Sequence, residues 1–265
     1  MVKKNTPIKI NSINEVNKDF PKDVFKILYG IEEKHFWFWG RNKIITQEIG
    51  KFIKTKNSNI LEIGCGTGFV LSHLEKMGYK TTGLDIYPEA LKYARKRTKS
   101  QLICANIQKD EIPGRYDAVG LFDVLEHIDD DASFLKSTKK LLKRNGMLFI
   151  TVPADKKLWS ISDQLSGHKR RYNVKMLQKV LEKAKFTIEE IKYFGFLLYL
   201  PQFILRKLKT GKSALTFRDA FLQSYQTPRD WLNFLGKVIY LVESLLFQTI
   251  TFPFGSSLIV VARKI

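Results

Sequence analysis

Short apolar runs alternate with amphipathic segments through the middle of the chain. Five runs have the length of buried strands, at 60–63, 80–85, 101–105, 117–122 and 147–152. Between them, apolar residues recur every three to four positions, as is typical of helices, over 69–77, 89–98 and 132–143. This alternation predicts an α/β domain in which a parallel sheet is covered by helices on both faces.

The same pattern predicts further elements on either side of this region. Downstream, a helix and then two strands are expected at 175–185, 187–194 and 258–262. Upstream, residues 14–53 are expected to form helices on either side of an aromatic run at 35–41. Asn145-Gly146 is expected to end the helix that precedes the fifth strand.

About sixty residues before the last strand leave this pattern. Phe194–Leu205 is apolar apart from Gln202 and is followed by Arg206-Lys207-Leu208-Lys209, and Trp231–Leu246 carries an apolar stripe at helical spacing. The first segment is short and contains a proline, and the second is amphipathic, so neither predicts a membrane-spanning helix. We expect the first to lie on an anionic bilayer and the second to be a lid or a dimer contact.

The composition adds a strong positive charge to this picture. The 265 residues include 45 Lys+Arg and 26 Asp+Glu, which gives a net charge of +19. Such an excess indicates an anionic partner, either nucleic acid, a phospholipid surface or a phosphorylated substrate, unless it reflects a lysine-rich surface without a partner. Two cysteines exclude a disulfide framework, and no leader opens the chain, so a cytoplasmic location is expected.

The first strand of the alternating region ends in a glycine-rich turn, Glu62-Ile63-Gly64-Cys65-Gly66-Thr67-Gly68. Such a turn lets the backbone approach a ligand and directs the N–H groups of a helix N-terminus at an anion. Asp85 closes the second strand, where a carboxylate can accept hydrogen bonds from two ribose hydroxyls. The glycine spacing differs from that of nicotinamide dehydrogenases, and no second glycine-rich unit follows Val152.

These motifs, together with Phe122-Asp123-Val124-Leu125-Glu126-His127-Ile128, resemble the class I S-adenosylmethionine-dependent methyltransferases. The most similar group contains the ubiquinone-biosynthesis O-methyltransferases. The resemblance covers about residues 57–153 and implies a Rossmann-like, doubly wound seven-stranded sheet whose last strand is antiparallel, with S-adenosylmethionine as cofactor. The domains expected on this basis are a helical cap, a methyltransferase core, a helical insertion and the last core strand, at 1–57, 58–193, 194–256 and 257–265.

The resemblance also implies which residues hold the methyl donor. The glycine loop would hold the methionine moiety, Asp85 the ribose, and residues after the third and fourth strands the adenine. Asn106 stands where the family usually has Asp, and its amide oxygen can still accept a hydrogen bond. The expected cofactor contacts are Arg41, Glu62, Gly64, Cys65, Gly66, Gly68, Asp85, Ile86, Asn106, Ile107 and Phe122.

Two constellations of residues are candidates for the chemistry. His127 follows the fourth strand at the ligand-binding edge of the sheet and is a candidate base, although Glu126-His127 could equally open the next helix. Similar Glu-His pairs in some relatives bind a divalent cation. Here Asp123 stands at the first ligand position and no downstream His pair matches, so a metal stays open.

The second constellation lies within Gly167–Tyr172. His168 is a candidate base, and two guanidiniums could hold an anionic group, unless the segment is only the basic start of a helix capped by Asn173. The aromatic run before Arg41 could cover the donor pocket or pack the first helices on the sheet. The expected acceptor contacts are Trp39, Arg170, Arg171 and Tyr172.

These observations favour a methyltransferase acting at oxygen on a small or lipid-linked, anionic acceptor. An RNA methyltransferase and a non-catalytic donor-binding subunit are the alternatives, but no RNA-binding module is recognisable. The basic, apolar insertion predicts peripheral association with the inner face of a membrane. The sequence leaves the oligomeric state open.

Overall fold

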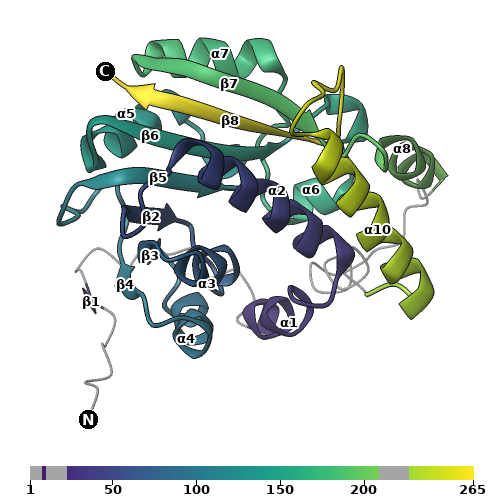
Figure 1. The fold of residues 1–265 in the computed structure, drawn as a ribbon, viewed down its shortest axis with the longest axis horizontal. Helices are drawn as coiled ribbons and strands as arrows, with labels where there is room; N and C mark the ends of the chain where they lie inside the picture. The colour runs from purple at the N-terminus through teal and green to yellow at the C-terminus, as the bar shows by residue number, and fades with distance from the viewer. Residues whose placement is uncertain (1–7, 10–22, 209–226) are drawn as a thin grey trace.

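The strands form one sheet in the order β1-β4-β3-β2-β5-β6-β8-β7 (Figure 1). The computed structural model describes residues 8–9, 23–208 and 227–265. Strand β8 is antiparallel to both β6 and β7, whereas the other neighbouring pairs are parallel. The strands are β1 (Ile8–Lys9), β2 (Asn59–Ile63), β3 (Lys80–Asp85), β4 (Gln101–Cys104), β5 (Tyr116–Phe122), β6 (Leu142–Pro153), β7 (Phe186–Phe194) and β8 (Ser257–Lys264). Strands β2 to β8 confirm the predicted Rossmann-like sheet with its antiparallel last strand, and the two-residue β1 adds an eighth strand that was not predicted.

Helices cover both faces of this sheet. On β5, Val119 and Leu121 join the core beneath α5 and α7, whereas Ala118 and Phe122 join the core beneath α2 and α3, as the twofold period of a strand requires. The helices are α1 (Asp23–Ile31), α2 (Phe36–Phe52), α3 (Phe69–Lys76), α4 (Pro88–Arg97), α5 (Asp131–Leu141), α6 (Ile161–Leu165), α7 (Val174–Lys183), α8 (Tyr199–Leu208) and α10 (Asp230–Leu246), with short 3-10 turns η2 (Leu125–His127) and η3 (Lys156–Leu158).

Two local predictions differ from the structure. The aromatic run at 35–41 is not a connection between helices, because α2 begins at Phe36 and includes the rest of the run. The His35 side chain accepts the Trp37 N–H and so caps the helix. Helix α5 ends at Leu141, before Asn145-Gly146, which lies inside the long strand β6. Asn145 has a φ of 60°, so it bends this strand instead of stopping the helix. The helical residues expected between 14 and 22 lie outside the described residues.

Helices α2 and α10 lie side by side (Figure 1). They pack closely because each has a glycine where the other presents a ring. A Cβ atom on Gly40 would lie 2.1 Å from the Tyr240 ring, and one on Gly236 would lie 2.5 Å from the Phe36 ring. Asn233 of α10 also accepts the Phe36 N–H at 2.8 Å. The insertion before β8 is therefore attached to the N-terminal helices.

Helix α10 directs its apolar stripe away from the protein. The residues of α10 that are buried are Gly236, Tyr240, Glu243 and Ser244. In contrast, Trp231 is 62% exposed and Phe234 is 69% exposed, and the rest of the stripe is also exposed, namely Leu235, Val238, Leu241, Val242, Leu245 and Leu246. The interpretation of this stripe as a lid packed on the sheet is therefore wrong.

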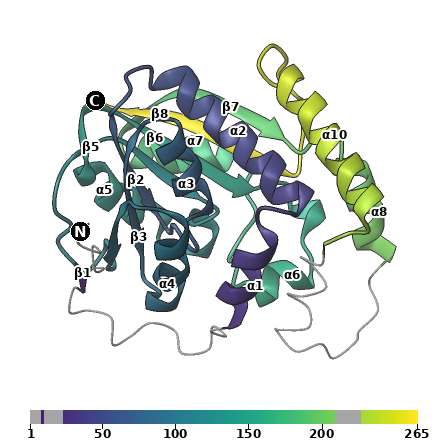
Figure 2. The same ribbon diagram turned by 60° about the horizontal axis from the view of Figure 1, so that its bottom comes forward.

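Helix α8 lies beside α10 at the same end of the molecule in both views (Figures 1 and 2). The Glu243 side chain of α10 accepts N–H groups from Phe196 and Leu197, just before α8, at 3.2 and 3.0 Å. Leu200, Ile204 and Leu205 of α8 are exposed as well. We call the exposed apolar residues of these two helices the α8–α10 face. No helix in the described part of the chain is long and apolar enough to cross a bilayer.

Candidate active site

The glycine loop after β2 is held by hydrogen bonds to β3. The N–H groups of Gly64 and Cys65 both donate to the Leu84 carbonyl, at 2.7 and 3.0 Å, and the Cys65 side chain packs into the core. Gly64, Gly66 and Gly68 have φ angles of 73°, 52° and 77°, which glycine adopts without steric cost. A Cβ on Gly66 would meet no described atom within 4 Å, so there is open space for a ligand against the loop.

Asp85 ends β3 beside this loop. Its Oδ2 accepts the Gly66 N–H and its Oδ1 accepts the Tyr87 N–H, both at 2.8 Å. Each carboxylate oxygen retains a second lone pair, so both can still accept from ribose hydroxyls. Burial raises the pKa of Asp85 to about 6, although the backbone N–H groups oppose this change. The predicted ribose contact fits this geometry and stays a prediction.

Two ionisable side chains, Glu62 and Arg41, lie near the loop. Burial raises the pKa of Glu62 to about 8, and the Arg41 charge opposes this shift. The Arg41 Nε atom lies 2.7 Å from Oδ2 of Asp123, which follows β5 with a φ of 57°. Asp123 also accepts the Thr151 hydroxyl at 3.1 Å. Arg41 is thus held at the ligand-binding edge of the sheet, and its contact with the methionine carboxylate stays a prediction.

A polar clamp that the sequence did not reveal fixes the loop to the N-terminal helices. The Glu32 carboxylate accepts hydrogen bonds from the Thr67 hydroxyl and from Arg97 at the end of α4. Arg97 also donates to the Thr67 hydroxyl at 2.8 Å and to the Tyr29 carbonyl at 2.9 Å. The partners in these hydrogen bonds are 30 to 68 positions apart, so apart from the place of Thr67 in the glycine loop no local pattern could reveal them.

The remaining predicted cofactor contacts lie at the ends of β3, β4 and β5, and those after β4 and β5 are the ones expected near the adenine. The Asn106 amide oxygen accepts the Gln108 N–H at 2.9 Å and keeps a lone pair for a further donor. Ile86 is exposed, whereas Ile107 and Phe122 are buried. The adenine contacts stay predictions.

A second group of polar side chains brings together the two histidines that the sequence singled out. Glu126 and His127 lie in η2, and His168 lies between α6 and α7. The Lys169 N–H donates to the Glu126 carbonyl at 2.8 Å and so holds these segments together. The two imidazoles meet edge to face with ring centres 4.8 Å apart, and His168 Nε2 lies 4.0 Å from Glu126 Oε1. We call these three residues the Glu126 cluster.

The Glu126 carboxyl group is buried but makes no hydrogen bond to the described residues. Burial, and then the Asp123 charge, raise the pKa of Glu126 well above its usual range. The potential ligand atoms of the cluster lie within 4.8 Å of one another, so it could hold a metal ion. His168 thus supplies the downstream histidine that the sequence did not pair with Glu126-His127.

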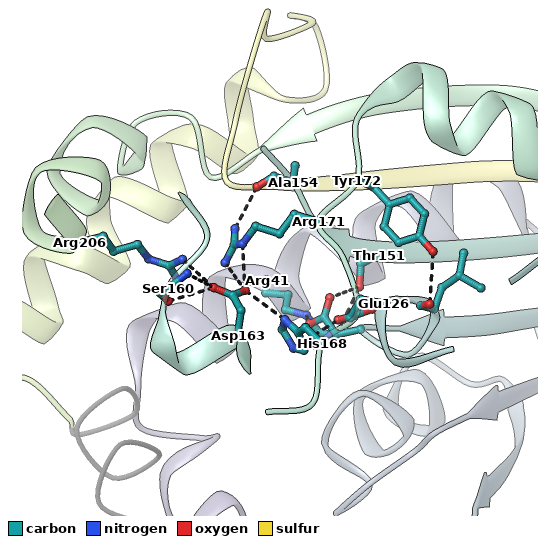
Figure 3. A network of polar contacts seen from close by, with 12 residues as sticks. Arg41, Glu126, Thr151, Ala154, Ser160, Asp163, His168, Arg171, Tyr172 and Arg206 are labelled. Atoms are coloured by element: carbon teal, nitrogen blue, oxygen red, sulfur yellow. Dashed lines mark hydrogen bonds and ion pairs between the residues drawn. The ribbon is translucent and has the colours of Figure 1, made fainter. Parts of the chain in front are cut away.

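Asp163 of α6 connects His168 to two arginines (Figure 3). Its Oδ1 accepts from His168 Nδ1 at 3.1 Å and from the Nε atom of Arg171 at 2.9 Å, and the Nη1 atom of Arg206 lies 3.3 Å from Oδ2. Burial would raise the pKa of Asp163, but the His168 hydrogen bond and the Arg171 charge hold it well below its usual range. Arg171 also donates to the Ala154 carbonyl at 2.9 Å, so its contacts lie within the protein.

The other three side chains that were predicted to contact the acceptor also contact other parts of the protein. Arg170 and the Tyr172 hydroxyl both donate to the Asp131 carboxylate at 2.9 Å, and Tyr172 is buried in the core. Trp39 is two residues from Arg41 on α2, about 200° around the helix, and packs on the core. These side chains are thus held by contacts within the protein, and their contact with the acceptor stays a prediction.

The region that contains these side chains is similar to known proteins. A family profile described as a methyltransferase domain matches residues 38–191, more than half of the chain, including the glycine loop, Asp85 and the Glu126 cluster. The chain belongs to this methyltransferase family. Its fold is that of the class I S-adenosylmethionine-dependent methyltransferases, as the motifs around the first strand predicted, and S-adenosylmethionine is the cofactor expected for it.

Curated relatives of this methyltransferase include ubiquinone biosynthesis O-methyltransferases. The protein of Proteus mirabilis is 34% identical over 108 residues, covering 38% of this chain and 44% of the relative. That of Colwellia psychrerythraea is 31% identical over 125 residues, covering 42% and 51%. The chain therefore matches only about half the length of these relatives.

Solved structures share the fold at low identity. The N-methyltransferase NodS of Bradyrhizobium japonicum, in complex with S-adenosylhomocysteine, has a TM-score of 0.54 at 15% identity, covering 91% of this chain and 98% of that one. The [4+2]-cyclase SpnF has a TM-score of 0.55 at 16% identity, covering 84% and 81%. Because a cyclase shares the fold, the fold alone does not define the reaction.

Proposed function

We propose that this methyltransferase acts at an oxygen atom of a small or lipid-linked, anionic acceptor. The observation that carries the proposal is the Glu126 cluster, which places two imidazoles at the same edge of the sheet as the glycine loop. Methylation at a neutral hydroxyl releases a proton, and a positioned imidazole can accept it. The name of the O-methyltransferase relatives supports oxygen as the atom modified, and the net charge of +19 supports an anionic acceptor.

The chain's own residues would align and deprotonate the acceptor. When bound, S-adenosylmethionine supplies a methyl group on a sulfonium, and transfer forms the oxygen–carbon bond as the carbon–sulfur bond breaks and its electron pair returns to sulfur. The glycine loop and Asp85 would hold the donor, and His168 Nε2 would take the acceptor proton. His127, against the His168 ring, would contact the acceptor. Alignment of donor and acceptor would supply much of the rate.

The acceptor class can be tested with labelled methyl donor. We expect purified protein and isotope-labelled S-adenosylmethionine to label the lipid extract of the source cell, or its anionic small molecules, on an oxygen atom. His168→Ala should abolish labelling without changing donor affinity. Label in RNA would support the nucleic-acid alternative, and donor binding without any labelled product would support a non-catalytic subunit; either result would contradict the proposal.

A divalent cation is a second candidate for the same cluster, because both Glu126 oxygens are buried and have no hydrogen-bond partner among the described residues. Glu126, His127 and His168 would hold it, and it would supply a Lewis acid that acidifies the acceptor hydroxyl. Calorimetric titration with Mn²⁺ tests this directly: binding that Glu126→Gln abolishes supports the cation. Activity that survives chelation, with no heat of Mn²⁺ binding, leaves His168 as the base.

We also propose that the protein associates peripherally with a membrane. The α8–α10 face consists of exposed apolar residues on two neighbouring helices, and Arg206 and Lys207 lie in the last turn of α8. Lys209, which the prediction also used, lies outside the described residues. An apolar face beside basic residues is typical of helices that lie on anionic bilayers. A second copy of the chain is less suited to this face, because each copy carries +19.

Liposome flotation tests the membrane contact. We expect the protein to float with vesicles of phosphatidylglycerol and phosphatidylcholine, and to float less at high salt and with neutral vesicles. Leu200→Ser with Phe234→Ser should reduce flotation strongly, because both side chains are exposed. Phe196 is a poor choice, since its ring stacks on Phe252 with centres 4.7 Å apart. Equal flotation of the double variant, or a stable dimer that buries this face, would contradict the proposal.

A further inference from the structure

Asp163 is the point where α8 and the Glu126 cluster meet (Figure 3). Its side chain is 2% exposed, and it accepts hydrogen bonds from four residues of the chain. Both the N–H and the hydroxyl of Ser160 donate to Oδ2 at 2.9 Å, which closes the first turn of α6. The other partners are His168, Arg171 and Arg206. One carboxylate therefore fixes a catalytic candidate and a helix of the insertion at the same time.

The hydrogen bond to Asp163 determines which nitrogen of His168 is available. An ionised carboxylate only accepts, so Nδ1 of His168 must carry the proton that it donates at 3.1 Å. In the neutral ring the lone pair is then on Nε2, which faces Glu126 at 4.0 Å. A base needs that lone pair toward the acceptor, and a metal ligand needs it toward the ion. The hydrogen bond from Asp163 therefore suits His168 both as a base and as a metal ligand.

Helix α8 is attached to the same segment by polar contacts at both of its ends. The Tyr199 hydroxyl, at the start of α8, donates to the Asp155 carboxylate. Arg206, near its end, donates to the Leu158 carbonyl as well as to Asp163. A displacement of α8 would therefore alter the arginine contact that helps to fix the Asp163 carboxylate.

We propose that Asp163 is the positioning residue for His168 and that α8, through Arg206, couples the lipid contact to it. The coupling rests on the proposed membrane function, whereas the positioning of His168 does not. Lipid that engages the outward residues of α8 would stabilise its docked position and so the productive orientation of the imidazole. Turnover should then rise on anionic vesicles even when an acceptor is already soluble and saturating.

Two matched variants of α8 test the coupling. Arg206→Gln removes the contact with Asp163, whereas Lys207→Gln removes the same charge one residue away. We expect Arg206→Gln to lower kcat at least fivefold, to leave the donor KM within twofold, and to lose stimulation by phosphatidylglycerol vesicles while flotation matches that of Lys207→Gln. Equal kcat and equal vesicle stimulation in the two variants would overturn the coupling.

The positioning of His168 is tested without any acceptor. Side-chain ¹H–¹⁵N spectra of the histidines report which ring nitrogen carries the proton. We expect the Nδ1–H tautomer of His168 in the wild type and a mixture in Asp163→Asn, whose amide can both donate and accept. Circular dichroism should show that Asp163→Asn stays folded, and Arg206→Gln provides a milder variant if it does not. An unchanged tautomer in both variants would overturn the positioning role, whatever the acceptor proves to be.

Discussion

Gly66 is the residue at which the donor site can be changed most selectively. Its φ of 52° is compatible with Asn, and a Cβ there meets no described atom within 4 Å. Gly66→Asn should therefore fold normally and fill the space against the loop. We expect at least a tenfold loss of affinity for S-adenosylhomocysteine by calorimetry, with a melting temperature within a few degrees of wild type. Unchanged affinity would mean that the ligand does not approach this loop.

Asp85 should make donor affinity depend on pH. Burial raises the pKa of Asp85 to about 6, and its ionised form offers the ribose more acceptors than its protonated form. Affinity for S-adenosylhomocysteine should therefore rise with pH up to about 6, by at most about tenfold per unit, and level off above it. Without ligand, the same raised pKa makes folding less favourable as pH rises from about 4 to about 6. Asp85→Asn should bind weakly and remove the affinity profile; an unchanged profile in that variant would assign it to another group.

At the scale of elements, the glycine contacts between α2 and α10 should be sensitive to a single methyl group. Gly236→Ala would place a Cβ about 2.5 Å from the Phe36 ring, so α10 must shift or the helices must separate. We expect a loss of about 1–3 kcal/mol in the free energy of unfolding, measured with urea. Gly30→Ala in α1 is the control, because a Cβ there meets no described atom within 4 Å and should not destabilise the protein. Equal stability of both variants would contradict the close crossing.

The sequence predicted most elements because apolar periodicity is a local property. Strands such as β2 and β5 and helices such as α3 follow it to within one or two residues. It could not predict which way α10 faces, because periodicity shows which side is apolar and not what covers that side. The bend at Asn145 was missed for a related reason, since an Asn-Gly pair fits both a helix end and an irregular strand.

The candidate site was predictable where its residues follow one strand–turn–helix unit, as the glycine loop does. The Glu126 cluster was not, because it forms only when the chain after β6 returns to η2 through the Lys169 hydrogen bond. For the same reason Arg171 was expected at the acceptor, although its donors are used by Asp163 and Ala154. The candidate residues could be named from the sequence, but their partners could not, because those contacts join segments far apart in the chain.

At the scale of the whole molecule, long-range polar contacts hold the donor loop and the Glu126 cluster in place. The N-terminal helices hold the loop through Glu32, and Asp163 links the cluster to α8. The net charge of +19 acts over the entire surface, so it should steer the protein toward anionic membranes in a salt-dependent way. Donor binding, which the loop is expected to control, can therefore be separated from methyl transfer, which the cluster is expected to control.

The turnover of His168→Ala at saturating S-adenosylmethionine is the most direct test of this separation. The measurement uses the acceptor fraction that the wild type labels, with donor affinity measured by calorimetry on the same preparation. We expect a loss of about 10²–10⁴-fold in turnover, the usual contribution of a positioned base, with donor affinity within twofold of wild type. Wild-type turnover in His168→Ala would contradict the assignment of the Glu126 cluster as the site of methyl transfer.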